Sequence, residues 1–423
     1  MDLFFYKIKL ILGDKTLLKR LGFVALAFIV FRACAAIAIP GVDQAALAQF
    51  FAGSQFFGLL NVFSGGGLSN LSLVMLGVGP FITASIIMQL MTMVFPQLKE
   101  MYQEDGAAGR LKFAQYSRIL TVPLALVQGF GILTLLKNQG ILGAITVPQM
   151  AVNVIIVTAG SIFLMWLGEL ISEYGVGNGV SLIIFAGIVA RFPNDLVQLS
   201  ANFDPSQIPL YIGFFIVAVI IVAGVVVVTE AERPIPVTYA KRIRGSKVYG
   251  GGSTYLPLRL NQAGVMPIIF ALSILLFPQM ISVFLASIDN SIVRAISDLL
   301  ATINNNRLIY GVLYFVLVFL FTYFYTAVTF DPEMIATNLQ KSGAFIPGVR
   351  PGQSTSLYLG HIITRLTLVG ATFLGLIAIL PLIMQEITGI QALAIGGTAL
   401  LIVVSVALEF VKQVDAQISM REY

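Results

Sequence analysis

Long apolar segments alternate with short polar ones along almost the whole chain. Each apolar segment comes close to the length of about 20 residues that an α-helix needs to cross a hydrocarbon core. Only elements that satisfy their own backbone hydrogen bonds can face lipid, so the pattern predicts an all-α polytopic membrane protein. The ten predicted spans are Leu21–Ile39, Leu73–Phe95, Gln115–Leu136, Ala151–Ile171, Val180–Leu199, Pro209–Thr229, Asn261–Leu285, Ile309–Phe330, Leu359–Met384 and Gln391–Val411.

These spans divide evenly at the polar, proline-containing stretch Arg191–Pro209. Each half then has an odd number of spans, so the second half begins on the opposite face of the membrane and any duplication would be an inverted repeat. We therefore predict an N-terminal half over residues 1–200 and a C-terminal half over residues 201–423. Sequence similarity between the halves is too weak to show a repeat, and the symmetry is inferred from topology alone.

Basic residues are distributed unevenly between the polar segments. No Lys or Arg lies between Arg32 and Lys99, whereas the segments on either side of this gap are rich in both. Short basic loops remain in the cytoplasm, so the bias predicts that both termini are cytoplasmic. Of the 25 basic residues, 20 lie on the predicted cytoplasmic side. The other five are Arg32, which lies within a span, and Lys137, Arg191, Arg294 and Arg307, which lie on the outer side.

Composition supports a membrane protein. Hydrophobic residues make up 58% of the chain and charged residues 11%, against about 45–50% and about 25% in soluble domains. The single cysteine, Cys34, excludes a disulfide framework and is interpreted as a packing residue. The first apolar run is too long for a cleavable signal peptide, and we expect none.

Few ionisable groups fall inside the predicted spans. They are Arg32, Glu169 and Glu409, and the lone His361 lies at the edge of the ninth span, where we interpret it as solvated or interfacial. An ion-coupled transporter would place carboxylates or histidines near the midplane. No spacing matches a metal site, a phosphate-binding loop or a nucleophile elbow. We therefore expect neither enzymatic activity nor a cofactor.

The segment Asn61–Ser72 reads NVFSGGGLSNLS. Its three consecutive glycines interrupt any helix, and the short apolar stretch that follows leads directly into the second span. This pattern predicts a short re-entrant helix joined to a full span, which is tolerated at membrane depth only beside protein or a water-filled cavity. An external surface loop fits the residues equally well.

Two long polar segments, Glu230–Leu260 and Asp331–Tyr358, are predicted to be cytoplasmic loops. The first holds the cluster AKRIRGSK, which suits a protein partner or the headgroups of lipids. The second mixes apolar, proline and basic residues around Phe345 and Arg350, which favours contact with a protein over simple solvation.

Five strings in this chain carry a specific resemblance. They are FSGGGLSNLSLVMLGVGPFITASIIMQL (Phe63–Leu90), MWLGELISEYGVGNGVSLIIFAGIVA (Met165–Ala190), NQAGVMPIIFA (Asn261–Ala271), NLQKSGAFIPGVRPGQST (Asn338–Thr355) and TRLTLVGA (Thr364–Ala371). With these strings in this order, the chain resembles the SecY family over nearly its whole length. That family forms the central subunit of the bacterial protein-conducting channel.

The resemblance implies an hourglass channel of two halves, hinged at the loop between the fifth and sixth spans. It implies a ring of aliphatic side chains at the narrowest point. A narrow apolar constriction dewets and so resists ions, while aliphatic side chains can deform around a passing polypeptide. Ordinary helix packing would explain any one of these residues taken alone. The implied ring is Val78, Ile82, Val180, Ile184, Ile269 and Ile402.

The resemblance also implies a plug in Asn61–Ser72 that fills the outer funnel at rest, and a lateral gate between the second and third spans and the seventh and eighth. Polar groups in the gate could hydrogen-bond across it until a signal sequence competes, although local backbone bonds are an alternative, above all for Thr83. The plug residues are Asn61, Phe63, Gly65, Gly66, Gly67, Leu68 and Leu71, and the gate residues are Thr83, Gln89, Gln128 and Asn261.

Partners follow from the same resemblance. Lys241, Arg242 and Arg350 match basic positions that engage the ribosome or the SecA motor, and their charge suits RNA or acidic surfaces. SecE and SecG are the expected small membrane subunits, and signal sequences, unfolded preproteins and membrane lipids the expected ligands. We thus expect a passive protein-conducting channel in the bacterial cytoplasmic membrane. A secondary transporter and an insertase or scaffold without a through-pore are the alternatives.

Overall fold

The computed structural model describes residues 13–40, 47, 61, 64–103, 105–138, 140–142, 145–201, 208–239, 242–244, 247–249, 252–286, 306–388 and 391–419. Within them a helix lies at each of the ten predicted positions. These helices are α2 (Lys15–Ala36), α5 (Gly79–Val94), α7 (Gly106–Asn138), α8 (Val147–Tyr174), α9 (Gly179–Ala201), α10 (Ile208–Glu230), α11 (Met266–Ala286), α13 (Arg307–Thr329), α15 (Gln353–Thr388) and α16 (Gln391–Ser419).

Length and apolarity mark several of these helices as membrane spans. In the described part of the chain, four helical segments are by themselves long and apolar enough to cross a bilayer: Gly106–Asn138, Val147–Tyr174, Leu308–Lys341 and Gln353–Leu380. Helix α5 and the short α6 (Pro96–Gln103) would count as a fifth span if taken together, but they are bent by 113°. Pro96 explains this bend, because a proline disfavours helical backbone in the residue before it.

Side-chain caps mark where several helices begin. Asp14, Asn306 and Asp331 each precede a helix and accept hydrogen bonds from backbone N–H groups of its first turn. The helices capped in this way are α2, α13 and the short α14 (Pro332–Lys341). Those N–H groups have no partner inside the helix, so a capping oxygen replaces the water they would otherwise need.

The second span begins later than its hydropathy predicts. The described residues 64–78 form successive turns, and the helix starts at Gly79 instead of Leu73. Leu73 N donates to the Ile37 carbonyl at 3.0 Å, and the Ile39 N–H donates to the Leu71 carbonyl at 2.8 Å. This antiparallel pairing with the end of α2 uses the backbone groups that a helix would need, so the apolar residues stay buried without being helical.

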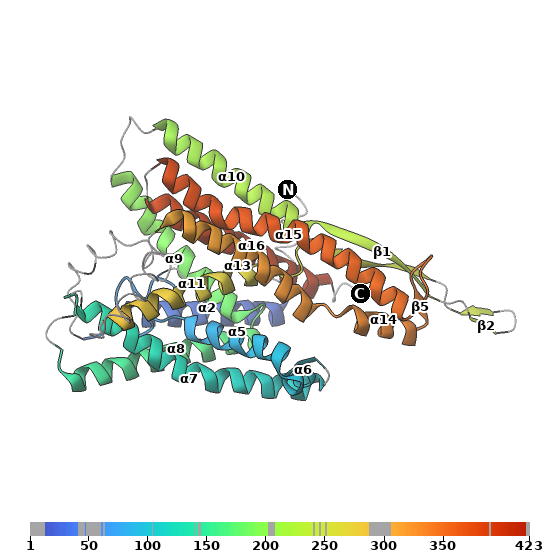
Figure 1. Cartoon of the computed structure of the whole chain (residues 1–423), viewed down its shortest axis with the longest axis horizontal. Helices are drawn as coiled ribbons and strands as arrows, with labels where there is room; N and C mark the ends of the chain where they lie inside the picture. The colour runs from blue at the N-terminus through green and yellow to red at the C-terminus, as the bar shows by residue number, and fades with distance from the viewer. Residues whose placement is uncertain are drawn as a thin grey trace.

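The described helices before residue 202 pack mainly against one another, and those after it do the same, so two groups can be distinguished. In Figure 1, α7, α8 and the α5–α6 pair lie below, and α10, α15 and α16 lie above. The groups meet along two seams, since α11 packs against α5 and α7, and α16 packs against α9. The predicted hinge, residues 202–207 between α9 and α10, lies outside the described residues.

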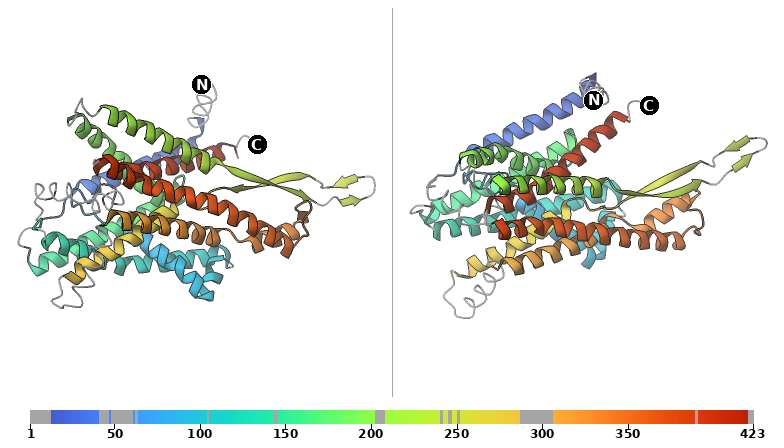
Figure 2. Two further views of the ribbon diagram at one scale, coloured as in Figure 1. Left: turned by 45° about the horizontal axis from the view of Figure 1, so that its top comes forward. Right: turned by 90° about the horizontal axis from the view of Figure 1, so that it is seen from above.

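The chain is predominantly helical but not all-α, which corrects the prediction. The segment after α10 is a hairpin in which β1 (Glu232–Tyr239) pairs antiparallel with β4 (Ser253–Arg259), with Glu232 opposite Arg259. Two short strands, β2 (Arg242–Arg244) and β3 (Lys247–Tyr249), continue it toward the tip. Figure 2 shows the hairpin projecting from one end of the helical body. Alternating Ile235 and Val237, both buried, are the strand signal that the loop prediction missed.

A separate apolar cluster fixes this hairpin to the helices. Ile235, Val237 and Leu258 pack with Leu359 of α15 and with Ala344 of β5 (Ala344–Phe345), which pairs with the end of β1. The hairpin base is therefore a small hydrophobic core of its own at the end of α15.

We expect Leu359→Ala to loosen this hairpin, because Leu359 is 0% exposed in the cluster and such truncations cost about 2–5 kcal/mol. Limited proteolysis of purified protein should cleave residues 232–259 at least about tenfold faster. Leu357→Ala is the matched control, since Leu357 lies on the same helix but is 61% exposed. Equal cleavage of the two variants would contradict this account of the hairpin base.

Candidate pore and plug

The predicted ring residues meet in one hydrophobic cluster. Val78 precedes α5 and Ile82 lies on it, while Ile184, Ile269 and Ile402 come from α9, α11 and α16. All five are buried, at 0–5% exposure, and belong to one contiguous core shared by both helical groups. Val180 is half-buried and packs against the edge of this core. Five of the six side chains are thus buried in the main core, which also includes residues of α2, α8, α10, α13 and α15, and the sixth lies at its edge.

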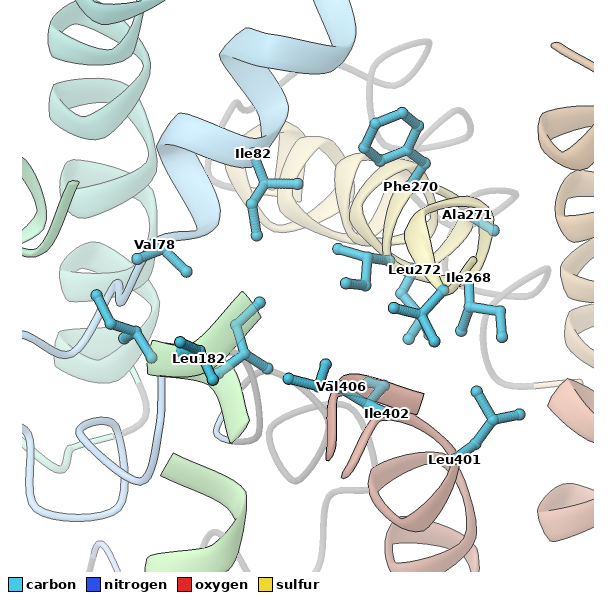
Figure 3. Close-up of a cluster of buried hydrophobic side chains, with 14 of the residues drawn as sticks. Val78, Ile82, Leu182, Ile268, Phe270, Ala271, Leu272, Leu401, Ile402 and Val406 are labelled. Atoms are coloured by element: carbon cyan, nitrogen blue, oxygen red, sulfur yellow. The ribbon is translucent and has the colours of Figure 1, made fainter. Parts of the chain in front are cut away.

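Figure 3 shows further aliphatic side chains in this cluster that the sequence analysis did not name. Leu182 of α9, Leu272 of α11 and Val406 of α16 are buried there as well. Leu272 and Val406 follow ring residues at spacings of three and four, so they share a helical face with them. That periodicity could have identified both from the sequence. Phe270 instead points away from the centre of the cluster, toward Phe321 of α13.

The described part of the predicted plug is closed by its own hydrogen bonds. The Asn61 side-chain oxygen accepts from the Ser69 N–H at 2.9 Å and from the Ser64 hydroxyl at 3.3 Å. The same hydroxyl accepts from the Leu68 N–H at 3.0 Å. Gly66 N donates to the Asn61 carbonyl at 2.9 Å. Residues 64–72 are therefore a compact set of turns where a short helix was predicted, and Phe63 lies outside the described residues.

The plug segment packs on the N-terminal group of helices. Leu68 and Leu71 are fully buried in a second apolar cluster with Leu133 and Leu136 of α7 and Val157 of α8. Gly65 and Gly66 have φ angles of 65° and 84°, in the left-handed region that L-residues with a side chain avoid. The glycine run is thus required by the turns as well as by any later movement.

The predicted gate residues lie on α5, on α7 and just before α11, the helices that form one seam, and in the described part of the chain they form no hydrogen bond across it. Thr83 is buried on α5, Gln128 is half-buried on α7, and the buried Gln89 side-chain oxygen has no hydrogen-bond partner. Asn261 donates to the Gly264 carbonyl at 3.0 Å within its own turn. Among the described residues, none of the four side chains hydrogen-bonds to the opposite face. Local bonding therefore replaces the predicted cross-gate bond at Asn261, because Gly264 folds the turn back onto it.

The described basic partner residues lie at the hairpin end of the molecule. Arg350 is exposed between β5 and α15, where its carbonyl accepts from the Thr355 hydroxyl at 2.9 Å. Arg242 opens β2 opposite Tyr249, and both β2 and β5 lie at one end in Figure 1. Lys241 lies outside the described residues.

The carboxylate predicted inside the fourth span has a structural partner. Glu169 of α8 accepts a hydrogen bond from Arg118 of α7 at 2.6 Å. The carboxylate is therefore paired with the guanidinium of Arg118. No group of three or more His, Cys, Asp or Glu that could hold a metal ion occurs among the described residues. His361 is exposed and its Nδ1 lies 2.9 Å from the Leu357 carbonyl.

We expect Asn61→Leu to open the plug turns, because it removes the acceptor of the partly buried Ser69 N–H and of the buried Ser64 hydroxyl. An unsatisfied buried group costs about 1–3 kcal/mol, so amide hydrogen exchange over residues 64–72 should accelerate about tenfold or more. Asn70→Leu is the matched control, since Asn70 is exposed in the same segment. Equal exchange in the two variants would show that Asn61 does not hold the turns.

Comparison with solved structures identifies the fold. The chain matches, at a TM-score of 0.66 and 20% identity, a structure of the SecY protein whose plug domain stabilises the closed state of the translocation channel; the match covers 97% of this chain and 94% of that one. It also matches Sec61 in the canine ribosome–channel complex at a TM-score of 0.60 and 19% identity, with the same coverage. The fold is therefore that of a multi-pass protein-conducting channel.

Sequence comparison gives the family. Residues 72–411 match the SecY family. The protein translocase subunit SecY of Corynebacterium glutamicum is 43% identical over 97% of this chain and 97% of its own length. The chain belongs to the SecY family, and so it is a protein-conducting channel subunit and not an enzyme.

Proposed function

We propose that this chain passes unfolded secretory polypeptides across the bacterial cytoplasmic membrane and releases hydrophobic segments sideways into the lipid. In this proposal ten spans form two inverted halves, residues 1–200 and 201–423, with both termini in the cytoplasm. The observation that carries it is the main aliphatic core, because it includes buried residues of α5 and α9 from one half and of α11 and α16 from the other. The 43% identity to a translocase subunit over almost the full length supports the same activity.

Val78, Ile82, Val180, Ile184, Ile269 and Ile402 form the seal of the resting channel. The burial of five of them in one core, with Val180 at its edge, supports this role, since an aliphatic constriction excludes water and therefore ions. Aliphatic contacts have no fixed direction, so they can separate around a polypeptide and form again after it has passed.

The lateral gate is the seam where α11 packs against α5 and α7. Because Thr83, Gln89, Gln128 and Asn261 do not bond across this seam, it is held mainly by apolar packing. A hydrophobic signal sequence offers similar contacts and can replace them at little cost in free energy. The seam between α9 and α16 lies elsewhere and can keep the halves together while the gate opens.

The plug comprises Asn61–Ser72 and moves as a unit. Its internal hydrogen bonds from Asn61 and Ser64 support this, because bonds within the segment can persist when it leaves its site. The packing of Leu68 and Leu71 with residues of α7 and α8 supports a resting plug that is held by the N-terminal half.

Partners bind the end that carries the hairpin. Arg350, Arg242 and Lys241 are the proposed contacts for the ribosome or the SecA motor, and the canine Sec61 relative is found in a ribosome complex. The exposure of Arg350 and the anchoring of its loop by Thr355 support a preformed contact point. SecE and SecG are the proposed small subunits that complete the channel.

Two other classes fit less well. A secondary transporter needs an ion or substrate site near the midplane, but Glu169 is already paired with Arg118. An insertase or scaffold without a through-pore would not need an aliphatic ring shared by both halves.

Reconstituted proteoliposomes test this function. With SecA and ATP, the complex should move a secretory precursor into a protease-protected lumen, and transport of small solutes alone would refute the proposal.

Arg350→Glu should reduce this activity at least about tenfold by reversing a charge at the motor contact, without changing the fold. Lys341→Glu, an exposed basic residue at the end of α14, is the control. Equal activity of the two variants would remove Arg350 from the contact.

We expect the double variant Ile82→Asn and Ile402→Asn to leak ions at rest. The amide groups would hydrate a constriction whose resistance depends on dryness, so conductance of the substrate-free channel in planar bilayers should rise. The matched control is Ile82→Val with Ile402→Val, which keeps the site aliphatic. Unchanged conductance in the asparagine variant would exclude these side chains from the seal.

A further inference from the structure

The plug touches two helices at Gly65, and the contacts leave no space for a side chain. A methyl group built on Gly65 would collide with the Phe31 ring of α2, which is 0% exposed. A methyl group built on Gly187 of α9 would collide with the Gly65 backbone. The plug backbone is therefore seated directly between α2 and α9.

A hydrogen bond from a charged side chain of α2 also holds Gly65. Arg32 donates from Nη1 to the Gly65 carbonyl at 3.2 Å. Arginine at membrane depth is costly unless its guanidinium is paired or hydrated, and hydrogen bonds from charged donors are stronger than neutral ones. This contact joins residues 33 positions apart in the chain, so it holds the plug through tertiary structure.

A second arginine, Arg191, lies next to the plug but forms no hydrogen bond to its described residues. The aliphatic part of Arg191 of α9 lies beside Gly66, since its Cγ is 3.6 Å from a Cβ built there. Its Nη1 atom is buried and has no hydrogen-bond partner among the described residues. The two arginines thus flank the glycine run, but Arg32 bonds to it and Arg191 does not.

We infer that Arg32 is a positioning residue that anchors the resting plug through the Gly65 carbonyl, with Phe31 and Gly187 forming the seat that fits only a glycine. This anchor rests on the proposed plug function of Asn61–Ser72. One charge-assisted hydrogen bond changes an equilibrium by about tenfold to a hundredfold. The anchor is therefore strong enough to favour the seated plug and weak enough for an entering polypeptide to release it.

Thiol labelling measures the position of the plug directly. In the assembled complex with Cys34→Ser, the buried Leu68 is replaced by Cys and its reaction with a water-soluble maleimide is timed. Arg32→Met, which keeps the length but removes the donor, should accelerate labelling about tenfold or more. Arg32→Lys should restore slow labelling, because it keeps a cationic donor. Arg191→Met is the matched control and should change the rate less than about twofold.

The seat is tested in the same background. Gly187→Ala should accelerate labelling of position 68, whereas Gly22→Ala on α2 should not, because a Cβ at Gly22 has no atom within 4 Å. Labelling of a Cys at Leu164, buried at 0% in the main core, should stay slow in every variant. Faster labelling at both positions would mean general loosening and would overturn the anchor, as would an Arg191→Met effect equal to that of Arg32→Met.

Resting conductance separates the anchor from the plug function. If Arg32→Met accelerates labelling without raising the ion conductance of the substrate-free channel, the anchor stands and the sealing role of the plug falls. If deletion of residues 64–70 raises conductance while Arg32→Met changes neither labelling nor conductance, the sealing role stands and the anchor is refuted.

Discussion

Apolar packing between two separate groups of helices is the interaction on which this structure depends. Val78, Ile82, Ile184, Ile269 and Ile402 belong to the same buried core, yet they come from elements of both groups. Because such packing is non-directional, it holds the groups together without fixing a unique set of partners. An interface of this kind suits the proposed seal, which must close tightly and open reversibly.

Directional interactions are found mainly inside each group. Arg118 and Glu169 pair between α7 and α8, and Lys412 and Glu230 pair at 3.0 Å between α16 and α10. Where the groups meet, the contacts are largely apolar, with a long hydrogen bond of 3.5 Å from Gln103 to the Val328 carbonyl. Polar bonds thus stiffen each group, while no buried polar network joins the two groups among the residues that the structure describes.

The plug segment also combines polar bonds within itself with mainly apolar contacts to its surroundings. Its turns are closed internally by Asn61 and Ser64, its leucines join the core of the N-terminal half, and Arg32 holds it at a single carbonyl. The backbone pairing of residues 37–39 with 71–73 ties its far end to α2. The described part of the segment is therefore closed by its own hydrogen bonds and is held to the surrounding helices by buried leucines, backbone pairing and one arginine.

The sequence by itself indicated ten apolar segments at which helices lie, because hydropathy over about 20 residues is a local property. It also indicated the aliphatic ring and the glycine run, through the family resemblance. Tertiary structure decided where the second span begins, since Gly79 follows a segment paired with the end of α2. It likewise decided that Asn261 bonds within its own turn and that Gly65 is seated against Gly187 and Arg32. Those outcomes depend on which distant groups compete for the same donor, acceptor or space, and no local pattern records that competition.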